Sequence, residues 1–68
     1  METYYLSLVA QTKGEHEVHV ASCVYLPERA KREFLGVFEN CHEAIKRAKD
    51  YFDNVDGCAY CCSDCHKR

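Results

Sequence analysis

Apolar and polar residues alternate along the N-terminal third of the chain, which is the pattern of strands with one buried face. In the first alternating segment, residues 3–12, the apolar positions are Tyr4, Leu6, Leu8 and Ala10. A second segment, residues 16–21, repeats the pattern, and Lys13-Gly14-Glu15 between the two is typical of a turn. We therefore predict two antiparallel strands joined by this turn.

The alternation is lost after Cys23. Pro27 has no backbone N–H to donate to a strand ladder, and the charged residues that follow it show no apolar period. We predict a loop from Val24 to Arg32 and a third, short strand from Glu33 to Phe38.

A single helix is predicted after residue 40. Asn40 is a good N-cap, and Glu43 stands three residues later, as in a capping box. The apolar residues at helical spacing are Cys41, Ala44, Ile45, Ala48, Tyr51 and Phe52. Residues 53–57 break the helix. The expected fold is α+β: a three-stranded antiparallel meander, one helix packed across it, and a cysteine-rich hook over residues 58–66.

The length of the chain makes a cross-link necessary. We expect residues 1–68 to be a single domain, and at this size folding buries only about 60% of the surface of the unfolded chain. Such a core needs a metal or a disulfide to stabilise it, and the chain has six cysteines.

The N-terminal sequence favours a bound metal over a disulfide, through the compartment that it indicates. Its acidic Glu2 and its interrupted apolar positions do not fit a signal peptide, and no apolar run approaches the roughly 18 residues of a membrane span. We expect a cytoplasmic, monomeric protein without a membrane anchor. In the reducing cytosol, paired cysteines are more often metal ligands than disulfides.

The C-terminal hook has the spacing of a metal site. Cys58 and Cys61 form one Cys-x2-Cys pair, and Gly57 precedes them where we expect a tight turn. The best second pair is His19 and Cys23, which would complete a tetrahedral Cys3His zinc site. Four protein ligands leave no position for water, so the predicted role of Zn²⁺ is structural and the protein is not expected to be an enzyme.

His19 and Cys23 can share an ion only if the strand ends between them. On a continuous strand, residues four apart are separated by about 13 Å, whereas zinc ligands lie only about 2.0 to 2.3 Å from the ion. We therefore expect the chain to curl after Val20. The alternative is a solvent-exposed histidine at the end of a strand, beside a buried cysteine.

Four further residues are secondary candidates for the site. Cys41 is either a core residue or a replacement for His19 as fourth ligand. Cys62, Cys65 and His66 could form a second site, an alternative ligand set or a redox pair. The two remaining histidines, His16 and His42, are expected on the surface.

The order of these residues resembles a known family. His19-x3-Cys23-x2-Leu26-Pro27, then Glu43-Ala44 at a helix, then Gly57-Cys58-x2-Cys61, is similar to the zinc-binding domain of Ada-type DNA-repair methyl acceptors and to small Ada-like modules of other bacterial proteins. The resemblance implies zinc at positions 19, 23, 58 and 61 and a DNA-associated setting. The repair domain uses four cysteines and methylates the first, whereas His19 has no thiolate, so methyl acceptance is not expected.

Charge and motifs restrict the function classes. The net charge of −2 gives no global attraction to nucleic acid, and the basic residues are interspersed with acidic ones. No phosphate-binding glycine loop or His-Glu-x2-His helix is present. We predict a zinc-stabilised binding module with a protein partner or a weakly bound nucleic acid. The alternative is a thiol-based redox or metal-handling protein using Cys61, Cys62 and Cys65.

Overall fold

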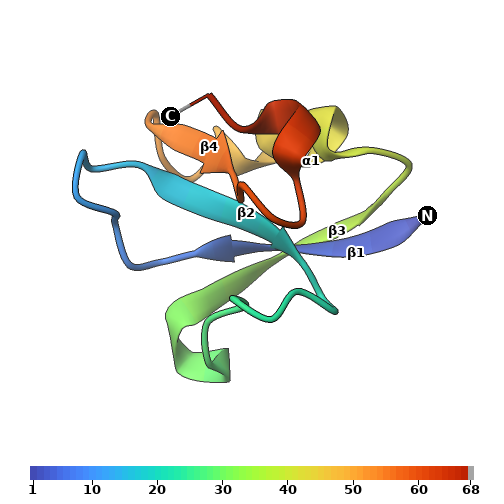
Figure 1. Ribbon diagram of the computed structural model, residues 1–68, viewed down its shortest axis with the longest axis horizontal. Coiled ribbons are helices and arrows are strands. Elements are labelled where there is room, and N and C mark those ends of the chain that lie inside the picture. The colour runs from blue at the N-terminus through green and yellow to red at the C-terminus, as the bar shows by residue number, and fades with distance from the viewer. Residues whose placement is uncertain (68) are drawn as a thin grey trace.

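The computed structural model describes residues 1–67 and confirms the α+β class. Its elements are β1 (Glu2–Ser7), β2 (His16–Val20), β3 (Arg32–Phe38), α1 (Cys41–Ala48) and β4 (Val55–Gly57), with two single 3₁₀ turns, η1 (Arg29–Lys31) and η2 (Ser63–Cys65). In Figure 1, α1 and the C-terminal turn lie on one side of the sheet, and η1 lies on the other.

The sheet has four strands and is mixed, so the predicted three-stranded meander is wrong. The strand order is β3-β1-β2-β4, with β1 antiparallel to both neighbours and β4 parallel to β2. The long loop after β2 returns the chain to the free edge of β1, where Leu8 N donates to Lys31 O at 2.9 Å. β4 went unpredicted because its three residues, Val-Asp-Gly, show no alternation.

β1 is shorter than predicted. The hydroxyl of Ser7 donates to Val9 O at 3.1 Å, and Val9 N lies 3.3 Å from the same Oγ, so the chain turns out of the sheet at this point. Leu8 is consequently 39% exposed instead of buried, and Val9 beside it is 51% exposed. The predicted turn around Gly14 is confirmed, since this residue has a φ of 87° that favours glycine.

The N-cap of α1 is confirmed, because Asn40 Oδ1 accepts a hydrogen bond from Glu43 N at 3.1 Å. The helix ends at Ala48, earlier than its apolar stripe suggests. Both Tyr51 N and Phe52 N donate to Ala48 O in the turn that follows. Tyr51 is thereby 41% exposed, whereas the ring of Phe52 stacks on His16 with centroids 3.6 Å apart.

The core lies between α1 and the sheet. Ala44 and Ala48 are fully buried and allow the helix backbone to approach Leu6 and Val18, which are also fully buried. Three cysteines complete this core, namely Cys41, Cys62 and Cys65. No helix in residues 1–67 has the length and apolar character to cross a membrane.

Candidate metal centre

The end of β2 supplies the first pair of candidate ligands. His19 lies on the strand, and the chain then turns so that Cys23 N donates to Val20 O at 3.1 Å. The predicted curl after Val20 is therefore confirmed. It places Cys23 Sγ 3.6 Å from His19 Nδ1.

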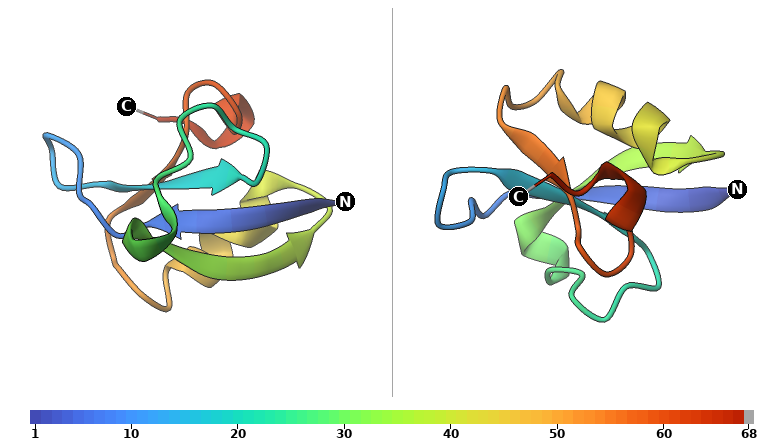
Figure 2. Two further views of the ribbon diagram at one scale, coloured as in Figure 1. Left: turned by 90° about the horizontal axis from the view of Figure 1, so that it is seen from below. Right: turned by 45° about the horizontal axis from the view of Figure 1, so that its top comes forward.

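The parallel pairing of β4 with β2 supplies the second pair. Cys58 follows β4 directly, and its N donates to Val18 O at 3.0 Å. Cys62 N then donates to Cys58 O at 2.9 Å and closes the turn that contains Cys61. Figure 2 shows the result, in which the hook meets the loop that follows β2.

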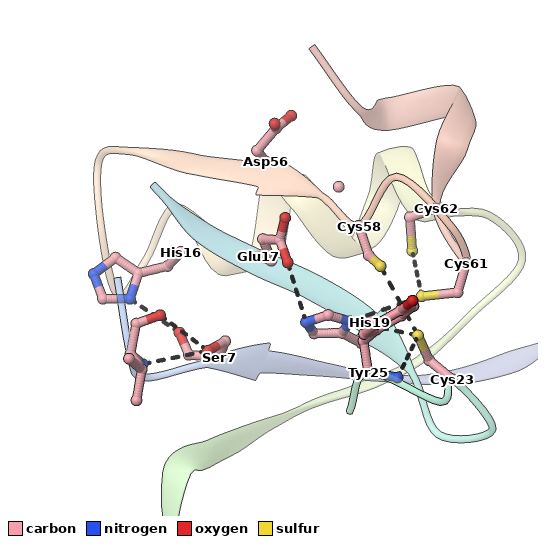
Figure 3. A network of polar contacts seen from close by, with 12 residues as sticks. Ser7, His16, Glu17, His19, Cys23, Tyr25, Asp56, Cys58, Cys61 and Cys62 are labelled. Carbon is pink, nitrogen blue, oxygen red and sulfur yellow. Dashed lines mark hydrogen bonds and ion pairs between the residues drawn. The ribbon is translucent and has the colours of Figure 1, made fainter. Parts of the chain in front are cut away.

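The structure thus brings together His19, Cys23, Cys58 and Cys61, which we call the first cluster. Their ligand atoms all lie within 4.8 Å of one another. Cys23 Sγ is 3.9 Å from Cys58 Sγ, and Cys61 Sγ is 3.9 Å from His19 Nδ1. In a tetrahedral zinc site the corresponding edges are about 3.6 Å for N to S and about 3.8 Å for S to S. The four residues therefore fit one metal ion (Figure 3).

Two backbone amides point at the sulfurs of this cluster. Val20 N lies 3.4 Å from Cys61 Sγ, and Tyr25 N lies 3.4 Å from Cys23 Sγ. Such N–H groups stabilise the negative charge of a thiolate. Burial acts in the opposite direction and raises the pKa of the Cys61 thiol. A positive ion beside Cys61 would favour its charged form against this effect of burial.

His19 is oriented from both sides of its ring. Nδ1 faces the sulfurs, while Nε2 lies 3.6 Å from Glu17 Oε1, in the arrangement by which a carboxylate orients a metal-binding histidine. The side chain is almost fully buried, and this burial lowers the pKa of His19. The imidazole is therefore neutral near pH 7, which leaves a ring nitrogen free to bind a metal.

Gly57 supports the hook in a way that differs from the expected tight turn. It belongs to β4, and a Cβ at this position would lie 2.7 Å from Cys62 O and 2.8 Å from Cys65 Cβ. The glycine is needed because the returning hook packs directly on the strand backbone.

A second cluster lies between the start of α1 and η2. It consists of Cys41, His42 and Cys65, whose ligand atoms also lie within 4.8 Å of one another. Cys41 and Cys65 form a disulfide, and His42 Nδ1 lies 3.6 Å from Cys65 Sγ. His42 is exposed, as predicted, but its place beside two sulfurs was not predicted. The sequence signal for this site was that His42 directly follows Cys41.

The secondary candidates fall differently from their predicted roles. Cys41 belongs to the second cluster and does not replace His19. Cys62 is a buried free thiol with its Sγ 3.9 Å from Cys61 Sγ, and it belongs to neither cluster. His66 Nδ1 lies 2.9 Å from Gly57 O and 3.3 Å from Asp56 Oδ2. Among the described residues, Cys62, Cys65 and His66 therefore form no common site.

Comparisons of the chain with protein-family models, with curated proteins and with solved structures gave no match. The resemblance to Ada-type domains stays a prediction, because none of these comparisons tests it.

Proposed function

We propose that this chain is a small zinc-stabilised interaction module, with Zn²⁺ held by His19, Cys23, Cys58 and Cys61. The observation that carries this proposal is the convergence of three sulfurs and one imidazole nitrogen within 4.8 Å. Three thiolates and an imidazole suit Zn²⁺ and disfavour the hard ions Mg²⁺ and Ca²⁺, which take oxygen ligands. Because all four ligands come from the protein, the ion has no open position and its role is structural.

The ion would cross-link two segments that are distant in the sequence. Cys23 stands in the loop that follows β2, and Cys58 and Cys61 stand in the hook. The core is small for 68 residues, so the free energy of metal binding becomes free energy of folding.

The same two segments present an exposed aromatic pair. Tyr25 in the loop and Tyr60 in the hook have ring centroids 4.5 Å apart and are 54% and 74% exposed. Val24 beside them is 87% exposed. Each tyrosine lies within two residues of a ligand cysteine, so the ion would fix their relative position. We propose that this surface, Val24, Tyr25 and Tyr60, contacts a protein partner, since tyrosine is enriched at such interfaces.

The basic residues support a protein partner over a nucleic acid. Those of η1 and those of α1 belong to elements on opposite sides of the sheet (Figure 1). Several are also engaged locally: Lys31 lies 3.7 Å from Glu28, and the Arg32 guanidinium stacks over the ring of Tyr5. A continuous basic face of the kind that tracks a phosphate backbone therefore does not arise from these two groups.

Metal analysis of the reduced, full-length chain tests the proposal. Zinc should remain bound after desalting, and Cys58→Ser should remove the ion from the first cluster. Cys62→Ser is the matched control, because this buried free thiol lies outside both clusters. Cadmium substitution followed by cadmium NMR should report a site with three thiolates. Absence of a tightly bound ion, or its retention in Cys58→Ser, would contradict the proposal.

A second candidate function, thiol redox or metal handling, is favoured by one observation. Cys41 and Cys65 are joined as a disulfide, while Cys61 and Cys62 nearby are free thiols with sulfurs 3.9 Å apart. The hook therefore holds both free thiols and one half of a disulfide whose other half, Cys41, is in α1. A reversible change of the Cys41–Cys65 bond under mild peroxide and dithiol treatment, followed by peptide mapping, tests this function.

A further inference from the structure

The second cluster is a potential metal site as well as a disulfide. Cys41 is the first residue of α1, His42 follows it, and Cys65 closes η2. We propose that these three residues bind a second zinc ion when both thiols are reduced, and that formation of the Cys41–Cys65 disulfide releases this ion. The proposal concerns a site distinct from the first cluster and does not depend on it.

The distances favour a metal over an isolated disulfide. His42 Nδ1 lies 3.6 Å from Cys65 Sγ, which equals the N-to-S edge of about 3.6 Å expected in a tetrahedral zinc site. The Cα atoms of Cys41 and Cys65 are 6.3 Å apart. In the reduced state, rotation of the cysteine side chains can therefore separate the two sulfurs to the S-to-S edge of about 3.8 Å without moving the helix. A disulfide alone has no need of an imidazole nitrogen beside it.

The second cluster differs from the first in its number of donors and in the exposure of its histidine. Cys41 and Cys65 are 7% and 6% exposed, whereas His42 is exposed. His42 and Asp64 together line two surface hollows, one of about 250 Å³ that also contacts Cys41 and one of about 160 Å³ that also contacts Cys65. Three protein ligands leave the fourth position of a tetrahedral ion to a water molecule from these hollows. Such an ion exchanges with solvent more readily than one with four protein ligands.

Oxidation and metal binding exclude each other at this cluster because both use the same two thiolates. With a hydroperoxide such as H2O2 as oxidant, the two thiolates lose two electrons in total, and an S–S bond forms. The O–O bond breaks, and with two protons from solvent it yields two water molecules. The sulfurs of a disulfide carry no negative charge, so the ion loses two of its three protein ligands and is released.

Zinc titration of the anaerobically reduced, full-length chain tests this inference. We expect two zinc ions per chain, one tightly bound and one more weakly bound. One equivalent of H2O2 should release the weaker ion, and peptide mapping should then find the Cys41–Cys65 disulfide. Failure of the reduced chain to bind an ion at Cys41, His42 and Cys65, or loss of both ions with disulfides among Cys23, Cys58 and Cys61, would overturn the proposal.

Two pairs of variants locate the second ion. His42→Ala should lower the affinity for the second zinc ion at least about tenfold. Removing a partner that only orients a metal ligand already lowers the affinity by this factor. His66→Ala is its matched control and should bind both ions normally. Likewise, Cys65→Ser should bind one ion, and Cys62→Ser should bind two. An unchanged affinity for the second zinc ion in His42→Ala would overturn the proposal. Because His42 is exposed, it can be replaced without disturbing the core.

A result confined to one cluster separates the two proposals. Cadmium NMR should show two resonances, one from a site with three thiolates and one from a site with two. If the wild-type protein lacks only the two-thiolate resonance, the second site is rejected and the first is retained. If it lacks only the three-thiolate resonance, the proposed function is rejected and the second site is retained.

Discussion

Both cysteine clusters use residues of the hook, but they are built in different ways. The first cluster joins the end of β2 to the residues after β4, and sheet hydrogen bonds such as Cys58 N to Val18 O fix its geometry. The second cluster joins α1 to η2, and side-chain packing fixes it. The first has four donors, two of them buried and two half-buried, whereas the second has three donors, of which His42 is exposed. The number of donors and their access to solvent thus separate a structural ion from an exchangeable one.

The largest expected effect comes from emptying the first cluster. Structural zinc contributes about 10 to 16 kcal/mol of apparent binding free energy in small domains, which matches or exceeds the net stability of about 5 to 15 kcal/mol of a typical domain. A strong chelator, or Cys58→Ser, should therefore abolish cooperative thermal unfolding measured by circular dichroism. Cys62→Ser should still unfold cooperatively. A chelated and reduced chain that melts cooperatively would show that the core is sufficient without the first ion.

The second cluster should contribute less to stability. Its disulfide spans 24 residues, for which constraint of the unfolded chain gives about 3 kcal/mol. Cys41→Ala should lower the free energy of unfolding by about this amount in the zinc-loaded, oxidised protein, as measured by denaturant titration. The first zinc should remain bound in this variant. Loss of that zinc together with the disulfide would mean that the two clusters are not separable.

A change at Gly57 should affect both clusters because the hook packs on this residue. Gly57→Ala should cost about 2 kcal/mol, since its Cβ would lie under 3.0 Å from Cys62 O and Cys65 Cβ. Gly14→Ala is the matched control in a turn. There the cost is only about 1 kcal/mol, from a positive φ without a clash. Equal unfolding free energies for the two variants would contradict the close packing at Gly57.

The smallest effect is expected at the helix cap. Asn40→Ala removes the hydrogen bond to Glu43 N and should cost about 1 kcal/mol. Because Cys41 and His42 stand in the first turn of α1, fraying there should lower the affinity for the second zinc ion more than the affinity for the first. Zinc titration of Asn40→Ala against Asn40→Asp, which retains a capping side chain, measures this difference. Equal weakening of both ions would contradict it.

Short-range patterns in the sequence were sufficient to predict several elements and the ligand set of the first cluster. Period-two alternation indicated β1 and β2, and the cap residue Asn40 marked the start of α1. The donor types and spacings of His19-x3-Cys23 and Cys58-x2-Cys61 identified the four residues that the structure brings together. His19 and Cys23 would be too far apart on a continuous strand to share an ion, so the sequence also indicated the turn after Val20. Each of these signals is contained within a few residues, where propensity and bond geometry act directly.

Only the tertiary structure decided which distant segments meet. β4 is a strand because the free edge of β2 is available to it, and no pattern in its three residues indicates this pairing. β3 joins β1 instead of β2 because the intervening loop crosses to the other edge of the sheet. The pairing of His42 and Cys41 with Cys65 likewise depends on how the hook packs against α1. Long-range contacts of this kind are selected by the burial of the whole core, and that cannot be read from local sequence.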